Sequence, residues 1–325
     1  MKAGKILFLC TNHFDLYKIF QNGMEQYSNC DVTTVLYQKF KYKNIKQKIR
    51  NFFSKLFLNQ NLKPFFASEA IIDCIPKNEY YDYILVICPD FLHPEHMSFL
   101  KSISKKTIVY YWDGFDHFPK YKESLPHFDA LFSFDPVDVK KYNLQFITNF
   151  YFTEDRNTEI KTDLFFLSSF DSRYPIIEKI FCLLEKQNKK VLIYQHTKDK
   201  NIIEKQKNNS IKFIDKHIPF EETTKLMKET KIVLDIHKDI QNGLSFRVFE
   251  AMGLGKKLIT TNTDVANYDF YNPNNIFIWK KDTNSIPDDF LNTSYQELPE
   301  PIYKKYSQEN WVKQIFDLNK THLPR

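Results

Sequence analysis

Glycine is scarce in this chain, at only 6 of 325 residues, which excludes collagen-like and glycine-linker sequences and makes each glycine's position informative. Cys-x-x-Cys pairs are missing as well, so the widely spaced cysteines predict buried, reduced thiols and not a disulfide framework. These cysteines are Cys10, Cys30, Cys74, Cys88 and Cys182. No signal peptide is recognisable, and no apolar run approaches the roughly 20 residues of a membrane-spanning helix. We therefore expect a soluble, cytoplasmic protein.

Acidic residues are missing from the segment between Lys39 and Ser68, which holds eight Lys and Arg. The whole chain has a net charge of +6, whereas the rest of it has 38 Lys and Arg against 40 Asp and Glu. The protein is thus a nearly neutral body with one basic segment. A single basic stripe without a known module argues against a nucleic-acid partner.

Within the basic segment, apolar residues recur at helical spacing between Ile45 and Leu56. This pattern predicts a cationic amphipathic helix, which suits the anionic inner face of the plasma membrane. The alternative is an ordinary helix whose apolar face packs on the domain core while its cations lie in water. The cations expected to face a membrane are Lys46, Lys48, Arg50 and Lys55.

The content of hydrophobic residues, 42%, is enough for a substantial core, and 325 residues correspond to about two domains. Apolar strands alternate with helices in both halves, a pattern typical of parallel α/β domains. Strands are expected at 5–11, 31–37, 83–88, 107–112, 130–134, 163–167, 190–194, 211–214, 232–236 and 257–261. We predict two Rossmann-like domains facing a central cleft, with domain boundaries at 1–152 and 153–305. A polar hinge is expected at 152–161, and a final helix at 306–325 that crosses back to the first domain.

The segment 239–262 carries the strongest signal, because three of the six glycines fall in it: Gly243, Gly253 and Gly255. Asn-Gly before Ser245 predicts a tight turn followed by a helix N-cap, and the two later glycines end the helix. A loop that leads into a helix after a parallel strand presents backbone N–H groups and a positive helix end. Such a site binds anions, and a diphosphate fits it.

Arg247 and Glu250 are three residues apart and therefore share one face of this helix. Arg247, in the first turn, could pair with a phosphate. Glu250 could accept hydrogen bonds from ribose hydroxyls. The alternative is an ordinary surface ion pair between the two side chains.

This segment resembles the donor-binding signature of GT-B glycosyltransferases, and in particular the branch for lipopolysaccharide and capsular polysaccharide biosynthesis. Three further landmarks of that branch recur in order along the chain. They are Tyr111-Trp-Asp-Gly114, Ser133-Phe-Asp135 and Asp171-Ser-Arg-Tyr174. The resemblance implies a GT-B fold, an N-terminal acceptor-binding domain and a C-terminal domain that binds the nucleotide-sugar.

Carried over by residue, the resemblance assigns the donor ribose to Glu250 and the diphosphate to backbone groups of Gly243, Leu244 and Ser245. Many retaining members have a second glutamate eight residues before the first, and this chain has Asn242 there. This departure leaves both the donor sugar and the choice between retention and inversion open.

Four further residues are candidates because they follow predicted strands. Arg173 could bind phosphate, and His217 lies in a connection that holds the nucleotide base in relatives. Asp113 is the preferred general base, and His13 is a second candidate for base or phosphate contact. The ordinary alternatives are a surface arginine, a solvated loop histidine, a turn cap beside Gly114 and a helix-capping loop.

No metal-binding constellation such as His-Glu-x-x-His or Asp-x-Asp is present, so we expect metal-independent catalysis, with no cofactor besides the nucleotide-sugar co-substrate. The expected activity is that of a hexosyltransferase-type enzyme acting on a glycan or lipid-linked acceptor in bacterial lipopolysaccharide or capsule synthesis. The alternatives are a nucleotide-sugar epimerase and a non-catalytic nucleotide-sugar-binding scaffold.

Overall fold

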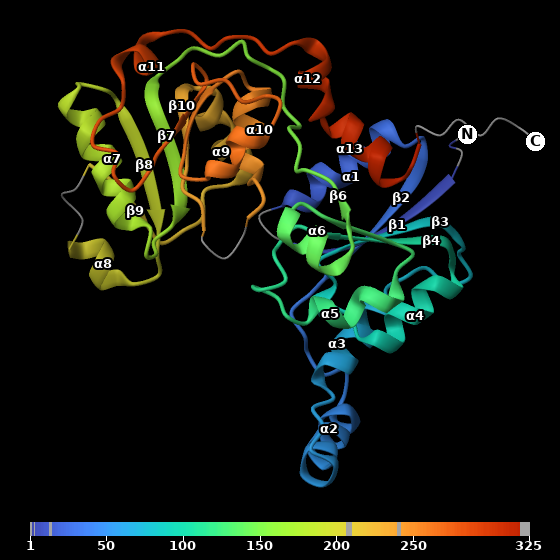
Figure 1. Cartoon of the computed structure of the whole chain (residues 1–325). Coiled ribbons are helices and arrows are strands. Elements are labelled where there is room, and N and C mark those ends of the chain that lie inside the picture. Colours follow the sequence, from blue (N-terminus) through green and yellow to red (C-terminus); the bar gives the residue numbers. More distant parts are fainter. Residues whose placement is uncertain (1, 3, 13–14, 206–209, 239–241, 319–325) are drawn as a thin grey trace, which may run out of the picture. The chain divides into compact units, whose positions relative to one another are not determined.

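The computed structural model describes residues 2, 4–12, 15–205, 210–238 and 242–318. Contacts between Cα atoms divide the chain into two compact units. The first unit comprises the chain up to Thr148 together with the segment from Trp311 onward, and the second comprises Asn149–Asn310. Each unit is a parallel sheet with its own helices (Figure 1). His13, one of the predicted site residues, lies outside the described residues.

The sheet of the first unit has six parallel strands in the order β2-β1-β3-β4-β5-β6. Their bounds are β1 Gly4–Thr11, β2 Cys30–Tyr37, β3 Tyr81–Ile87, β4 Ser104–Tyr111, β5 Ala130–Ser133 and β6 Gln145–Phe146. In β1 every residue from Ile6 to Cys10 is buried, because helices cover both faces of the sheet. The strand order reverses between β1 and β3.

The helices of the first unit include one pair, α2 and α3, inserted between β2 and β3. Their bounds are α1 Leu16–Tyr27, α2 Ile45–Leu58, α3 Lys63–Ile72, α4 Pro94–Ser102, α5 Tyr121–Ser124 and α6 Pro136–Tyr142, with 3₁₀ turns at η1 Pro89–Phe91 and η2 Leu125–His127. The last helix, α13 Gln308–Ile315, places Trp311 against Phe20 and Tyr110, at ring-centroid distances of 5.2 and 5.4 Å. These aromatic contacts hold the end of the chain on the first unit.

The sheet of the second unit also has six parallel strands, in the order β12-β11-β10-β7-β8-β9. Their bounds are β7 Thr162–Ser169, β8 Val191–His196, β9 Lys212–Ile214, β10 Thr230–Asp235, β11 Lys257–Thr260 and β12 Ile276–Ile278. The helices are α7 Tyr174–Lys186, α8 Lys200–Lys205, α9 Phe220–Lys228, α10 Phe246–Gly253, α11 Asp288–Asn292 and α12 Glu300–Lys305, with a 3₁₀ turn at η3 Thr263–Asn267.

The two faces of this second sheet pack on different helices, because successive side chains of a strand point to opposite faces. Leu164 and Phe166 of β7 lie in one core cluster with residues of α7 and α11. Phe165, between them, lies in a second cluster with Val248 and Phe249 of α10. The sheet is therefore covered on both faces, and ligands have access only at its edges and ends.

The C-terminal end of α10 is fixed by side chains from outside the helix. Arg156 donates hydrogen bonds to the carbonyl oxygens of Gly253 (3.0 Å) and Met252 (3.4 Å), which places a cation at the negative end of the helix dipole. A Cβ at Gly253 would lie 2.6 Å from the Cβ of Tyr151, and Gly255 has a φ of +62°. Both glycines thus have structural roles at the end of the helix, as the sequence predicted.

The structure corrects the sequence-based predictions for two cysteines and for some of the helices. Cys74, in the turn after α3, and Cys182, on α7, are exposed, and only the other three cysteines are buried. The helix predicted after residue 306 is present as α13, Gln308–Ile315, and the short helix α12, Glu300–Lys305, which precedes it, was not predicted. Helix α3 was not predicted, because its apolar residues show only weak helical periodicity.

Candidate functional site

The two central strands of the second sheet, β7 and β10, mark the point where the strand order reverses. From β7 the chain continues to β8 and β9 on one side, and it then returns to β10 and β11 on the other side. In open parallel sheets, ligands bind at the carboxyl ends of the strands that flank such a reversal. Arg173 follows β7, and the residues from Asn242 to Arg247 follow β10. The fold thus brings both predicted segments to this edge.

Arg247 is bound at this edge by a buried carboxylate that sequence reasoning missed. Asp235, the last residue of β10, is 3% exposed. Its Oδ1 accepts hydrogen bonds from Ser245 Oγ (2.8 Å) and Arg247 Nη1 (3.4 Å), and its Oδ2 accepts one from Thr260 Oγ1 (3.0 Å). Arg247 also donates to the carbonyl oxygen of Leu167 at the end of β7 (2.9 Å). In the sequence, an Asp at the end of an apolar strand, ahead of Ser245 and Arg247, was the signal that could have indicated this carboxylate.

Arg173, which follows β7, is also held by a carboxylate and by a carbonyl oxygen from the neighbouring strand. Its guanidinium holds Asp171 with two bonds, Nε–Oδ1 at 2.8 Å and Nη2–Oδ2 at 2.6 Å, and this pairing lowers the pKa of the Asp171 carboxyl. Its Nη1 donates to the carbonyl oxygen of Ile236, just after β10 (2.8 Å). Arg173 and Arg247 thus cross-link the ends of β7 and β10. Arg173 is therefore not the plain surface arginine of the alternative.

Glu250, in the second turn of α10, is a partly buried carboxylate without a hydrogen-bond donor in the part of the chain that the structure describes. Burial raises its pKa to about 7, against an opposing effect of Arg247. The surface ion pair between Arg247 and Glu250 is not present, because the ion pair of Arg247 goes to Asp235. A desolvated carboxylate of this kind can accept hydrogen bonds from ligand hydroxyl groups.

The loop before α10 is held by side-chain amides. Gly243 and Leu244 are buried, and their carbonyl oxygens accept hydrogen bonds from Asn262 (3.4 Å) and Asn149 (2.9 Å). Asn262 also contacts the ring Nδ1 of His237 (3.2 Å). Neither asparagine was predicted, although Asn262 directly follows an apolar strand. Asn242 is exposed at the start of this loop.

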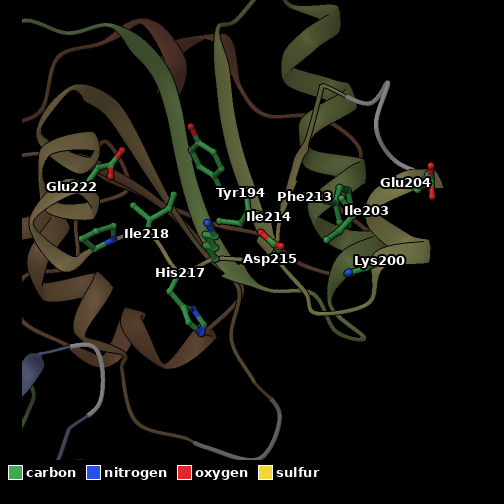
Figure 2. A pocket seen from close by; sticks show the side chains of 12 residues that line it. Tyr194, Lys200, Ile203, Glu204, Phe213, Ile214, Asp215, His217, Ile218 and Glu222 are labelled. Atoms are coloured by element: carbon green, nitrogen blue, oxygen red, sulfur yellow. The ribbon is translucent and has the colours of Figure 1, made fainter.

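His217 lines a cavity of about 640 Å³ beside the edge strand β9 and the loop that follows it. Tyr194, Phe213, Ile218 and Glu222 also line this cavity (Figure 2). The ring of His217 stacks on that of His196, with 3.7 Å between centroids. Desolvation, together with the charges of His196 and Lys198, lowers the pKa of the exposed His217. The cavity offers flat ring surfaces of the kind on which a planar heterocycle can stack.

In the first unit, Asp113 follows β4 at the carboxyl edge and is partly exposed. Asp113 also lies near Cys88, the residue that follows β3. Burial raises the pKa of the Cys88 thiol well above its ordinary value, and the negative charge of Asp113 raises it further. The neighbouring Asp116 instead pairs with Lys141 at 3.7 Å. Asp113 is thus a carboxylate at the edge where parallel sheets bind ligands.

The predicted cations of the basic segment lie on α2, and Lys46, Lys48, Arg50 and Lys55 are all exposed. The alternative for this helix, an apolar face packed on the domain core, is wrong. Among the described residues, no three His, Cys, Asp or Glu side chains form a group that could hold a metal ion. In the described ranges no helix has both the length and the apolar character needed to span a bilayer.

Comparisons with known proteins bear on the fold of this chain. Residues 199–295 match the model of a family described as glycosyl transferase-like. A comparison with curated proteins finds no match. Among solved structures, a HepE protein of Anabaena in complex with UDP-glucose is similar, with a TM-score of 0.56, 10% identity and coverage of 98% of this chain and 99% of that one.

Two other solved structures are similar to this chain. The catalytic domain of starch synthase IV from Arabidopsis thaliana, bound to ADP and acarbose, has a TM-score of 0.55 at 8% identity and covers 98% of this chain and 96% of its own. The MnaA protein of S. aureus in complex with UDP has a TM-score of 0.54 at 11% identity and covers 99% of both chains. The chain has the GT-B fold. The GT-B fold predicted from the sequence is therefore confirmed in its α/β class and its two parallel sheets.

Proposed function

We propose that the protein is a glycosyltransferase that takes a sugar from a nucleotide-sugar donor. The observation that carries this proposal is Glu250, a desolvated carboxylate to which no described residue donates a hydrogen bond, one turn into the helix that begins at the strand reversal of the second sheet. The family model that matches residues 199–295 includes this helix. The three similar structures hold UDP-glucose, ADP with acarbose, and UDP, which agrees with a nucleotide-sugar donor here.

In this proposal the second unit holds the whole donor. The diphosphate binds at the N-terminal end of α10, where backbone N–H groups and the guanidinium groups of Arg173 and Arg247 meet at one edge. Ribose hydroxyls donate to Glu250. The base lies in the cavity beside His217, because that cavity is at the same sheet edge and offers ring surfaces.

The reaction then needs a proton acceptor and a stabilised leaving group. An acceptor hydroxyl attacks the anomeric carbon, the bond from that carbon to the diphosphate oxygen breaks, and the diphosphate leaves with the electron pair. The hydroxyl proton passes to a base, for which Asp113 is the proposed residue if the stereochemistry inverts. The two arginines and the helix dipole would stabilise the diphosphate without a metal ion.

The finer assignments are also part of the proposal. We propose transfer of a hexose to a glycan or lipid-linked acceptor in bacterial lipopolysaccharide or capsule synthesis, in the cytoplasm at the inner membrane face. The support is the set of sequence landmarks around Trp112, Ser133 and Asp171 and the basic helix α2. Asn242 leaves the donor sugar and the stereochemical outcome open.

The test is a thermal-shift panel with UDP, GDP, CMP, ADP and dTDP on the wild type and Glu250→Gln. A ligand at 100 times its Kd adds about 2.7 kcal/mol to the free energy of unfolding, which is readily measured. We expect one nucleotide to stabilise the wild type and to lose most of its effect on the variant. Equal stabilisation of both proteins contradicts the role of Glu250, and no stabilisation of either contradicts the donor site itself.

Product analysis separates the transferase from its alternatives once the nucleotide is known. A transferase releases the nucleoside diphosphate and forms a glycosylated acceptor. An epimerase changes a stereocentre of the sugar without an acceptor. A binding scaffold retains the nucleotide-sugar unchanged with every acceptor that is offered.

A further inference from the structure

Helix α2 of the first unit has its polar face turned toward the protein and its apolar face turned toward water. The residues of this helix that are buried are Asn51 and Ser54. The exposed large side chains, with their exposed fractions, are Ile45 70%, Ile49 48%, Phe52 61%, Phe53 50%, Leu56 62%, Phe57 72% and Leu58 66%. This orientation is the reverse of that of an ordinary surface helix.

Hydrogen bonds from the polar face fix this orientation. Asn51 Nδ2 donates to the hydroxyl of Tyr42 (2.7 Å), and Asn51 Oδ1 accepts from the backbone N–H of Leu62 (2.7 Å). Gln47 Nε2 donates to Glu69 on α3 (3.1 Å). Rotating the helix to bury its apolar face would break these bonds. The exposed apolar face is therefore a stable feature.

Cations flank the apolar stripe on both sides. At 3.6 residues per turn, Lys48 and Lys55 lie along one border of the stripe, and Lys46 and Arg50 lie along the other. None of these four makes an ion pair in the described parts of the chain, and no Asp or Glu occurs in the whole helix. An apolar stripe between two rows of unpaired cations is the pattern of a helix that lies in the interface of an anionic bilayer.

The place of α2 in the fold connects this surface to the proposed acceptor edge. The chain leaves β2 at its carboxyl end, and the ring of Tyr37 there stacks on that of Phe91 beyond β3, at 5.6 Å. Helix α2 follows and projects from this unit, whereas α3 packs on it beside α4 and η1 (Figure 1). Because all strands of the sheet are parallel, α2 begins from the edge that also carries Asp113.

We propose that α2 lies in the headgroup region of a bilayer containing anionic lipids and holds the carboxyl edge of the first sheet beside it. A lipid-linked acceptor is then the substrate class that this edge would meet, and that part rests on the proposed function. Charge complementarity favours the bilayer over a second copy of the chain, because pairing two α2 helices would bring cations together. Each cation contributes about a fivefold increase in partitioning to such a surface.

The experiment measures sedimentation of the full chain with vesicles of equal parts phosphatidylglycerol and phosphatidylcholine, and with pure phosphatidylcholine vesicles. We expect binding to the anionic vesicles only. Lys48→Gln/Lys55→Gln should lower the partition coefficient about 30-fold. Phe52→Ser/Leu56→Ser should lower it by at least as much, since the inserted apolar area is lost.

Matched controls come from the same unit. Lys77→Gln/Lys120→Gln removes two exposed cations without ion pairs in the described structure, and Val137→Ser/Phe146→Ser removes two side chains that are 50% and 46% exposed. Both controls should partition like the wild type. Because all of the substituted side chains are exposed, every variant should keep the wild-type melting temperature, which shows that it is folded.

Equal partitioning of the wild type and the α2 variants overturns the proposal, and so does equal binding to both vesicle types. An α2-dependent dimer that does not bind vesicles, detected by light scattering, overturns it in favour of a second copy. The nucleotide thermal shift is measured on the same variants and does not depend on vesicles. Vesicle binding without a nucleotide shift contradicts the proposed function alone, and a nucleotide shift without vesicle binding contradicts the role of α2 alone.

Discussion

The two units hold the cations of their proposed sites in opposite ways. In the second unit, Arg173 and Arg247 are each bound to a carboxylate and to a carbonyl oxygen of the neighbouring strand. On α2 of the first unit, the described structure gives the four cations no acidic partner. A fixed guanidinium presents its donors in one geometry, which suits a ligand of defined shape. Flexible, unpaired cations suit a surface that has charge but no fixed shape.

The largest effect is expected when the anchor of the fixed cations is removed. Asp235→Ala should lower the free energy of unfolding by about 3 kcal/mol, because it leaves Arg247, Ser245 and Thr260 without their buried partner. Urea denaturation measures this change. Asp155→Ala is the control, since the Asp155 side chain is 60% exposed and its ion pair with Lys228 should contribute at most about 1 kcal/mol. Similar losses in the two variants would contradict a structural anchor at Asp235.

The next effect concerns Glu250, a desolvated carboxylate on α10 to which no described residue donates a hydrogen bond. Its pKa of about 7 in the folded protein is above the ordinary value of 4.5, so the folded state binds the proton more tightly. Stability relative to Glu250→Gln should therefore fall by about 3 kcal/mol as the pH rises from 4.5 to above 7. Thermal melts of the two proteins across this range measure the difference. A difference that does not vary with pH contradicts the raised pKa.

A smaller effect is expected when a fixed cation keeps its charge but loses its geometry. Arg247→Lys should raise the Kd of the stabilising nucleotide about tenfold, because lysine has no planar pair of donors. Isothermal calorimetry measures the affinity. Arg156→Lys, at the opposite end of α10, is the control: it should lower stability but leave the affinity unchanged. A larger loss of affinity in the control would place the diphosphate elsewhere.

The smallest effect on stability is expected for the cations of α2. Lys48→Gln/Lys55→Gln should change the free energy of unfolding by less than about 0.5 kcal/mol, because side chains without partners contribute little to stability. Urea denaturation in the absence of lipid measures it. A loss above about 1 kcal/mol would show that these cations support the fold, and the contrast with Arg173 and Arg247 would then disappear.

Much of the fold could be predicted because the sheet strands are nearly continuous apolar runs, such as Ile6–Cys10 in β1, that only a doubly covered parallel sheet buries. The short elements could not. β6 has two residues and β12 has three, so neither is long enough for a repeated alternation of apolar and polar side chains to be seen. The orientation of α2 was also open, since amphipathic periodicity shows that a helix has two faces but not which of them meets the protein.

For the candidate site, local motifs around Gly243 and Ser245 predicted the loop and the helix that follows. The partners of those residues could not be predicted, because they are distant in sequence. Asn149 binds Leu244 from 95 positions away, and Arg247 binds Leu167 from 80 positions away. Only strand order brings such residues together, and strand order depends on the packing of the whole sheet.

The hydrogen bonds of Asn51 and Gln47 have one further consequence, for the rate at which the protein would meet a surface. Many membrane-seeking helices are unfolded in water and lose backbone entropy when they bind. In this protein α2 is already formed and oriented by its own flanking segments. Association would then require no folding step, and its rate would be set by diffusion and by electrostatic attraction that weakens as salt is added.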